Sequence, residues 1–163
     1  MVGSRDSLPE EAKAKSGVNK QNHVDVSVVI PYLDESESLP ELYKQITQSL
    51  SSTNWSYELI FVDDGSQDSG WDIINSFRNA DDRVSGIKFT RNFGKSQALH
   101  AGFERSQGEV VFTIDADLQD NPKELEALYN KLKSENLDLV SGWKKVRHDP
   151  LFTKTIPSRF YNW

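Results

Sequence analysis

Short apolar runs alternate with amphipathic stretches along most of this chain. The runs that have the composition and length of strands are 24–30, 57–62, 84–89, 110–114 and 137–141. The stretches between them that have apolar residues at helical spacing are 38–50, 68–78, 96–106 and 122–134. Strands that alternate with helices usually pair in parallel, and the helices then cover both faces of the sheet. The sequence therefore predicts an α/β fold with a mostly parallel, twisted sheet.

Several residues are expected to set the ends of these elements. Pro31 should stop the first strand, because proline cannot donate a hydrogen bond to a neighbouring strand. Ser38 and Asn121 should be the N-caps of the first and fourth helices. The leucines of the fourth helix that should face the core are Leu125, Leu128 and Leu132.

Composition indicates one domain and excludes several classes of function. Residues 1–22 are rich in Lys, Glu, Ser and Gly and predict a mobile leader, whereas residues 23–163 predict one folded domain. A net charge of -6 argues against nucleic-acid binding by phosphate neutralisation, although basic residues near the C-terminus could form a local anion site. The chain has no cysteine, which excludes disulfides, thiolate metal sites and a cysteine nucleophile. No apolar run has membrane-spanning length, so the chain as given is expected to be soluble.

Polar and charged residues follow each of the first four predicted strands. In chain order they are Tyr32 and Glu35, then Asp63 and Asp64, then Arg91, Asn92, Gly94 and Lys95, and finally Asp115, Asp117 and Gln119. In open parallel sheets, ligands bind beyond the carboxyl ends of the strands, where loops and helix N-termini meet. Singly, Tyr32 suits a core-edge aromatic, Asp64-Gly65-Ser66 a turn and Lys95 a solvated surface charge equally well. Together, these residues predict a pocket for a metal ion, an aromatic or heterocyclic ring and an anion.

The residues after the fourth strand favour a metal site. Asp115 and Asp117 are two positions apart, so on an extended backbone they lie on the same side. With the amide of Gln119 they form a hard-oxygen set that suits Mg²⁺ or Mn²⁺. Taken alone, the same residues suit an acidic turn and a helix cap equally well, and Asp120 is expected to be a turn residue. Similarly, the adjacent Asp63 and Asp64 cannot both face one pocket, so one of them is expected to be structural.

Four segments resemble the successive motifs of the family 2 glycosyltransferases, most of all the polyprenyl-phosphate sugar transferases. They are Val28–Glu35, Val62–Ser66, Arg91–Lys95 and Asp115–Gln119, and the resemblance extends over residues 24–163. It implies a GT-A fold, a nucleotide-sugar donor and a divalent cation, Mg²⁺ or Mn²⁺. One alternative is a nucleotidyltransferase, which should have a Gly- and Arg-rich loop after the first strand, where this chain has Pro31–Glu35. The other is a receiver-like module, which should have its acid pair after the first strand, whereas Asp63-Asp64 follows the second.

The resemblance also implies roles for individual residues. Pro31, Tyr32 and Glu35 would line the nucleoside site, Asp64 would accept from the base, and Asp115 would contact the nucleoside or the sugar. The residues implied for the remaining roles are Asp117 and Gln119 for the metal and Lys144 and Arg159 for the acceptor phosphate. Lys144 stands where relatives often have arginine, and Leu33-Asp34 replaces the more usual small residue and asparagine. Lys95, at a helix start, could bind the donor diphosphate, and Asp115 and Asp117 are the expected catalytic residues.

The implied reaction is inverting transfer of a sugar from a UDP- or GDP-sugar, with a polyprenyl phosphate as the expected acceptor. A phosphate monoester is largely ionised near neutral pH and needs no strong general base. A saccharide hydroxyl in cell-envelope polysaccharide synthesis is the alternative acceptor, and its base would have to lie beyond Trp163. A non-catalytic nucleotide-binding module is a further alternative. The chain is expected to be the N-terminal part of a membrane-associated protein that acts at the cytoplasmic face, with its C-terminal part missing.

Overall fold

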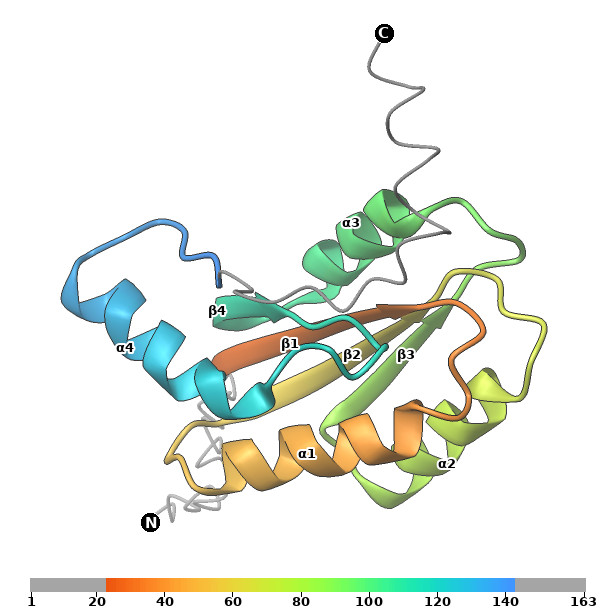
Figure 1. Ribbon diagram of the computed structural model, residues 1–163, viewed down its shortest axis with the longest axis horizontal. Coiled ribbons are helices and arrows are strands. Elements are labelled where there is room, and N and C mark those ends of the chain that lie inside the picture. The colour runs from red at the N-terminus through yellow and green to blue at the C-terminus, as the bar shows by residue number, and fades with distance from the viewer. Residues whose placement is uncertain (1–22, 143–163) are drawn as a thin grey trace, which may run out of the picture.

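The computed structural model describes residues 23–142, which form one parallel sheet with helices on both faces (Figure 1). The strands are β1 (Val24–Tyr32), β2 (Tyr57–Asp63), β3 (Val84–Lys88) and β4 (Gly108–Thr113). The helices are α1 (Leu39–Ser51), α2 (Gly70–Ala80), α3 (Lys95–Arg105), the short 3₁₀ helix η1 (Pro122–Glu124) and α4 (Leu125–Ser134). The predicted α/β class is confirmed, and the first four strands and all four helices lie within a few residues of their expected bounds.

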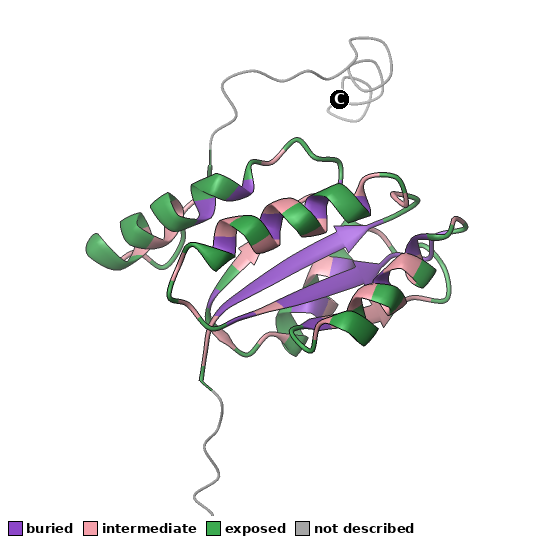
Figure 2. Ribbon diagram, turned by 90° about the horizontal axis from the view of Figure 1, so that it is seen from below, coloured by how far each residue is buried: buried purple, intermediate pink, exposed green. Residues whose placement is uncertain are grey.

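The sheet separates two layers of core, because side chains of a strand point alternately to its two faces. Val28 and Ile30 of β1 lie in the larger core cluster, which also contains buried leucines of α1 and Ile74 of α2. Val29 points the other way and packs with Ala98 of α3. Figure 2 shows the central strands buried along their length, with the helices exposed on their outer sides.

The strand order is β3-β2-β1-β4, and every neighbouring pair is parallel. The chain therefore moves outward from β1 to β3 and then returns past β1 to place β4 on the other side. This reversal puts α1 and α2 on one face and α3 on the other (Figure 1). The carboxyl ends of β1 and β4 diverge at this point, which is where open α/β sheets bind their ligands.

The prediction of a fifth strand at 137–141 is wrong. The part of the chain that the structure describes contains no strand after β4, and residues 137–141 are irregular. Leu139 is 82% exposed, so this short run buries too little apolar surface to hold an extended conformation among the described residues.

The prediction that Pro31 ends the first strand is also wrong, because β1 continues to Tyr32. Val29 accepts a hydrogen bond from the β4 side, whereas Tyr32 accepts one from Asp64 on the β2 side. Pro31 is two residues after Val29, so its backbone nitrogen, which carries no hydrogen, also faces the β4 side. The pairing of β1 with β4 stops at Val29, and proline at position 31 therefore removes no ladder bond.

The expected helix caps are only partly confirmed. The side chain of Asn121 accepts a hydrogen bond from the Lys123 N–H, as an N-cap does. Ser38 is at the N-cap position of α1, but its hydroxyl donates to Glu35 and caps no helical N–H. Of the leucines expected to face inward in α4, Leu125 is buried and the later two are half-buried.

A polar cluster closes the opposite end of the sheet, around Asp81. Its side chain is 8% exposed and accepts hydrogen bonds from Arg83 at 2.8 and 2.9 Å and from the Tyr43 hydroxyl at 2.8 Å. Arg83 also donates to the hydroxyl of Tyr57 and stacks over its ring. The hydrogen bonds from Arg83, opposed by burial, lower the pKa of Asp81 to about 2.

We expect Asp81 to contribute acid-sensitive stability. Because its folded pKa is depressed, this contribution is present above the unfolded pKa of 3.8 and is lost as pH falls toward about 2. The contribution is roughly 2 kcal/mol at neutral pH. Urea unfolding of wild type and Asp81→Asn between pH 2 and pH 7 measures it. The difference between the two proteins should shrink below pH 4, and a difference that is constant with pH would contradict the assignment.

Candidate functional site

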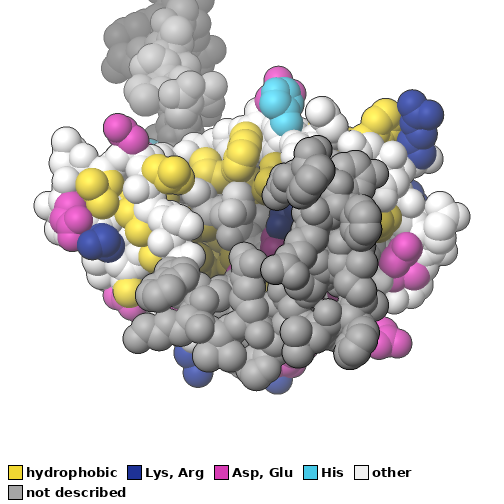
Figure 3. Space-filling model, turned by 45° about the horizontal axis from the view of Figure 1, so that its top comes forward, with side chains coloured by type: hydrophobic (Ala, Val, Ile, Leu, Met, Phe, Trp, Pro, Cys, Tyr) yellow, Lys and Arg dark blue, Asp and Glu magenta, His cyan; other side chains and the backbone are white. Residues whose placement is uncertain are grey.

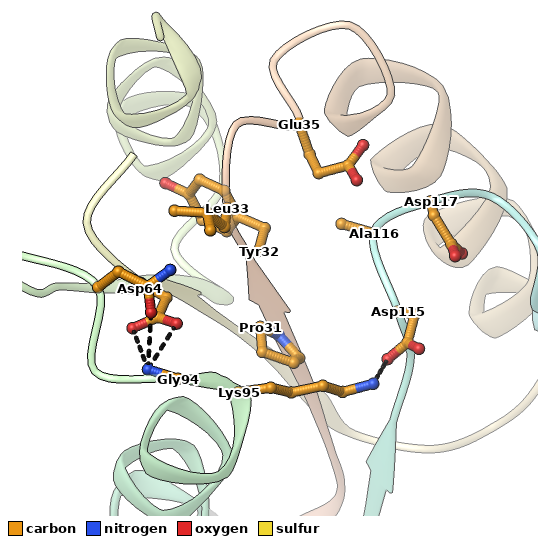
Figure 4. Close-up of a pocket in the computed structure, with 11 residues that line it drawn as sticks. Pro31, Tyr32, Leu33, Glu35, Asp64, Gly94, Lys95, Asp115, Ala116 and Asp117 are labelled. Carbon is orange, nitrogen blue, oxygen red and sulfur yellow. Dashed lines mark hydrogen bonds and ion pairs between the residues drawn. The ribbon is translucent and has the colours of Figure 1, made fainter. Parts of the chain in front are cut away.

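A pocket of about 290 Å³ lies at the carboxyl ends of β1 and β4. Its lining comes from the loops after β1, β2, β3 and β4, as the strand-end argument predicts. The residues that line it are Pro31, Tyr32, Leu33, Glu35, Asp64, Asn92, Gly94, Lys95, Asp115, Ala116 and Asp117. Figure 4 shows these side chains converging from the separate loops.

An ion pair crosses one side of this pocket (Figure 4). The Lys95 ammonium, at the first residue of α3, donates to Asp115 Oδ1 at 2.5 Å. Both side chains remain partly exposed, at 57% and 38% respectively. Both groups are therefore accessible to a ligand. An anionic group of the ligand could bind Lys95 in place of Asp115, and a hydroxyl group could bind Asp115 in place of Lys95.

The adjacent acids Asp63 and Asp64 have different roles, as expected. Asp63 is fully buried, and its Oδ1 accepts the Ser66 N–H at 2.7 Å, which closes the turn after β2. Asp64 lines the pocket and accepts the backbone N–H groups of Phe93 at 2.8 Å and Gly94 at 3.0 Å. The Asp64 carboxylate thus holds the loop before α3 as well as facing the pocket.

Tyr32 belongs more to the core than to the pocket surface. It is a lining residue, but it is only 4% exposed and belongs to the larger core cluster. Burial, with the nearby carboxylates of Asp63 and Asp68, raises the pKa of Tyr32 well above its ordinary value. The phenol therefore stays neutral near physiological pH and does not act as a base there.

Glu35 lies on the opposite side of the pocket from Lys95 (Figure 4). The single hydrogen of the Ser38 hydroxyl is shared between Glu35 Oε2, at 3.0 Å, and the Glu35 backbone carbonyl, at 2.9 Å. This arrangement fixes the start of α1 against the pocket and leaves carboxylate oxygen available on the pocket side.

Of the two residues expected to bind metal, Asp117 lines the pocket and Gln119 does not. Asp117 is exposed, and its Oδ1 accepts the Gln119 N–H at 3.1 Å. Within residues 23–142 no three His, Cys, Asp or Glu side chains gather into a metal site. One carboxylate with a nearby amide nevertheless suits Mg²⁺, which is commonly held by one or two carboxylates plus substrate phosphates. Gln119 is exposed and is not among the lining residues, so its role as a ligand stays a prediction.

The expected turn residue Asp120 lies among the described residues, whereas the expected acceptor-binding residues do not. Asp120 accepts the Asp115 N–H at 3.0 Å, which confirms it as a turn residue. Lys144 and Arg159, the expected acceptor-binding residues, lie outside the described residues. Sequence reasoning missed Leu33 and Ala116 as lining residues, because an apolar side chain beside a polar motif carries no distinctive signal.

On the face drawn in Figure 3, the visible Lys and Arg side chains are scattered and do not form a continuous basic surface. Among residues 23–142, none of the helices combines the length and the apolar character needed to cross a bilayer.

Comparison with known proteins decides the family. The family model described as "Glycosyl transferase family 2" matches residues 27–163. The chain belongs to glycosyl transferase family 2. The expected membership is confirmed, and the four motifs that carried the resemblance all lie within or at the edge of the matched region.

Among the curated relatives of this family 2 glycosyltransferase are undecaprenyl-phosphate 4-deoxy-4-formamido-L-arabinose transferases. Those of Salmonella choleraesuis (strain SC-B67) and Salmonella newport (strain SL254) are each 39% identical over 131 residues. The alignments cover 80% of this chain and 40% of each relative. The chain thus spans less than half the length of these curated relatives.

Solved structures share the fold of this family 2 glycosyltransferase at low identity. S. aureus TarS 1-349 in complex with UDP-GlcNAc has a TM-score of 0.57 and 17% identity, over 77% of this chain and 39% of that one. The mannosyltransferase PcManGT from Pyrobaculum calidifontis, in complex with GDP-Man and Mn2+, has a TM-score of 0.51 and 20% identity, over 66% and 31%. These likenesses confirm the GT-A-like α/β fold and no more.

Proposed function

We propose that this chain is the donor-binding part of an inverting glycosyltransferase that moves a sugar from a nucleotide-diphosphate sugar to a polyprenyl phosphate. The observation that carries the proposal is the pocket at the divergence of β1 and β4, where Asp115, Asp117 and Lys95 meet. Family membership supports the reaction class. The 39% identical relatives, which are named as undecaprenyl-phosphate transferases, support the acceptor.

The charge of the pocket supports a cation-dependent donor. Its lining includes four carboxylates, Glu35, Asp64, Asp115 and Asp117, and Lys95 is its single ammonium or guanidinium group among the described residues. A nucleoside diphosphate brings further negative charge, so it would be repelled from this pocket if it entered alone. Asp117 and Gln119 would hold a divalent cation here, and its chemistry would be to supply positive charge against the diphosphate leaving group.

Each side of the pocket has its own task in this proposal. Pro31, Tyr32, Glu35 and Asp64 form the nucleoside side, where carboxylates can accept hydrogen bonds from the base or the ribose. When the nucleotide sugar binds, Asp115 separates from Lys95 and accepts a hydrogen bond from a hydroxyl group of that nucleotide sugar. The freed Lys95 ammonium then binds a diphosphate oxygen near the N-terminus of α3, where the helix dipole also favours an anion.

The acceptor supplies its own nucleophile. The second ionisation of a phosphate monoester has a pKa of about 6, so a polyprenyl phosphate is largely dianionic at neutral pH. Its oxygen attacks the anomeric carbon as the bond to the nucleoside diphosphate breaks, which inverts that carbon and requires no proton transfer. Lys144 and Arg159 are the proposed acceptor ligands, and we place the reaction at the cytoplasmic face of a membrane.

Release of nucleoside diphosphate from a panel of UDP- and GDP-sugars by the full-length protein, with Mn²⁺, tests the proposal. Undecaprenyl phosphate should stimulate the release of UDP or GDP, whereas undecaprenol, the matched hydroxyl compound, should not. Equal stimulation by both compounds would favour a hydroxyl acceptor and contradict the phosphate assignment. The absence of release with every donor and either acceptor would overturn the proposed transfer.

Replacement of Lys95 by methionine should weaken binding of the nucleoside diphosphate by about ten- to a hundredfold, because charge-assisted hydrogen bonds contribute about 1.5–3 kcal/mol. Calorimetric titration with UDP and GDP in the presence of Mn²⁺ measures the change. Lys123→Met, which removes an exposed lysine of η1, is the control and should bind like wild type. Equal affinities of the two variants would remove Lys95 from the donor site.

A further inference from the structure

The loops after β1 and β2 exchange hydrogen bonds in both directions. We call residues 33–38 and 64–69 the paired loops. Glu35, which lines the pocket, is carried by the first of them. Three bonds join the paired loops, and all three fall on Asp34 or Ser36, the residues on either side of Glu35.

Asp34 is tied to the second loop through both its backbone and its side chain. Its N–H donates to Ser66 Oγ at 3.0 Å, and its Oδ1 accepts the Gln67 N–H at 2.7 Å. Ser66 is itself buried and held by Asp63. Asp34 also has φ of +54°, a left-handed conformation that aspartate and asparagine tolerate better than most residues.

Asp68 makes the reciprocal connection from the second loop. Its Oδ2 accepts the Ser36 N–H at 2.8 Å, and its Oδ1 accepts the Gly70 N–H at 2.9 Å at the start of α2. Partial burial alone would raise the pKa of Asp68, but the hydrogen bonds from Gly70 and Ser36 outweigh it and the pKa lies below its usual value. The carboxylate is therefore ionised at neutral pH and accepts both bonds.

We infer that Asp34 and Asp68 are positioning residues that hold the backbone of Glu35 from both sides and so preset its carboxylate for the donor. Neither residue is among those that line the pocket, so each acts through Glu35. The inference rests on the proposed function for its ligand, a nucleoside diphosphate with a divalent cation. Preorganisation of this kind raises affinity because the ligand does not have to order the loop itself.

A set of variants at position 34 separates side-chain bonding from backbone conformation. Asp34→Asn keeps the Oδ1 acceptor and tolerates the left-handed backbone, so it should bind the ligand within about twofold of wild type. Asp34→Gly keeps the backbone conformation but loses the acceptor, so it should bind about five- to tenfold more weakly. Asp68→Ala should resemble Asp34→Gly. Glu37→Ala is the control, because Glu37 lies in the same loop, is exposed and has no side-chain bond within residues 23–142.

Two measurements on the whole chain test the inference. The first is the affinity of the wild-type chain for UDP, GDP, CDP and ADP with Mn²⁺. The nucleotide that binds most tightly is then used to measure the affinity of each variant. The second is amide hydrogen exchange of Ser36 and Gln67 in the ligand-free protein, followed by NMR. Both amides should exchange faster in Asp34→Gly and Asp68→Ala than in Asp34→Asn, while the melting temperature of each variant shows that the fold is kept.

A double variant shows whether Asp34 acts through Glu35. If it does, Asp34→Gly combined with Glu35→Ala should bind no more weakly than Glu35→Ala alone. Additive losses would overturn the inference, as would equal affinities of Asp34→Asn and Asp34→Gly. If wild type binds none of the nucleotides, the proposed function fails, and the exchange rates still decide whether Asp34 and Asp68 hold the backbone around Glu35; unchanged rates would overturn that too.

Discussion

Replacement of Asp117 by alanine is expected to abolish metal-dependent binding of the nucleotide-sugar donor. Asp117 is the exposed carboxylate at the open edge of the pocket, and its one hydrogen bond from the Gln119 N–H is local. Loss of the ligand carboxylate should reduce donor affinity in Mn²⁺ by at least about tenfold, to the level measured with EDTA. Because exposed side chains contribute little to stability, the melting temperature should change by only a few degrees at most.

Two further variants sharpen the Asp117 prediction. Asp117→Asn keeps an oxygen for the Gln119 N–H but loses the charge, so it should fail almost as completely as alanine if the cation is held electrostatically. Glu126→Ala removes an exposed acid of α4 that has no side-chain bond among the described residues, and it should bind like wild type. Donor affinity in Asp117→Ala that is unchanged and still sensitive to EDTA would refute the metal assignment.

Replacement of Gly65 by alanine is expected to cause the largest loss of stability of any change around the pocket. Gly65 has φ of +86°, and an added Cβ would lie 2.3 Å from the backbone carbonyl carbon of Arg91 and 2.6 Å from the Asn92 nitrogen. Backbone strain of this kind costs about 1–3 kcal/mol. The steric clash adds about 1–3 kcal/mol, because a backbone cannot move aside as a flexible side chain can.

The glycine before α3 provides a matched control. Gly94 also has positive φ, at +95°, but no atom lies within 4 Å of an added Cβ. Gly94→Ala therefore carries backbone strain at positive φ without the clash, and urea unfolding should show Gly65→Ala to be the less stable of the two. Gly65→Ala should also weaken donor binding, because the displaced 91–94 loop would break its bonds to Asp64. Equal stabilities of the two variants would contradict the proposed close approach.

The fold could be predicted from the sequence where the pattern of apolar residues matches the burial that the element has in the structure. The strands at 24–30 and 57–62 become apolar on both faces in their second halves, at 28–30 and 59–62, and both are central in the sheet. The run at 137–141 has the same kind of residues, yet Leu139 is exposed and no strand forms. Local composition does not say whether a neighbouring strand is present to pair with it. The continuation of β1 through Pro31 likewise depends on which side of the strand is paired, and only the register shows that.

The site could be predicted at the level of loops and less well at the level of bonds. Parallel topology places strand ends together, so the lining by Glu35, Asp64, Lys95, Asp115 and Asp117 followed from the sequence. Two features did not follow: the ion pair across the pocket, and the use of Asp64 by the backbone of Phe93 and Gly94. These depend on side-chain directions in the loops, which no sequence period fixes. For Tyr32 the sequence left a core-edge position and a pocket position open. The roles of the individual residues toward a donor stay predictions.

The central claim is that this pocket binds a nucleoside diphosphate together with a divalent cation. Calorimetric titration of the wild-type chain with UDP, GDP and their sugars, each with Mn²⁺ and with EDTA, tests it most directly. Because four carboxylates face one lysine in the pocket, we predict saturable binding of at least one nucleotide with Mn²⁺ and at least tenfold weaker binding with EDTA. Absence of binding by every nucleotide in Mn²⁺, or equal affinity with EDTA, would contradict the account.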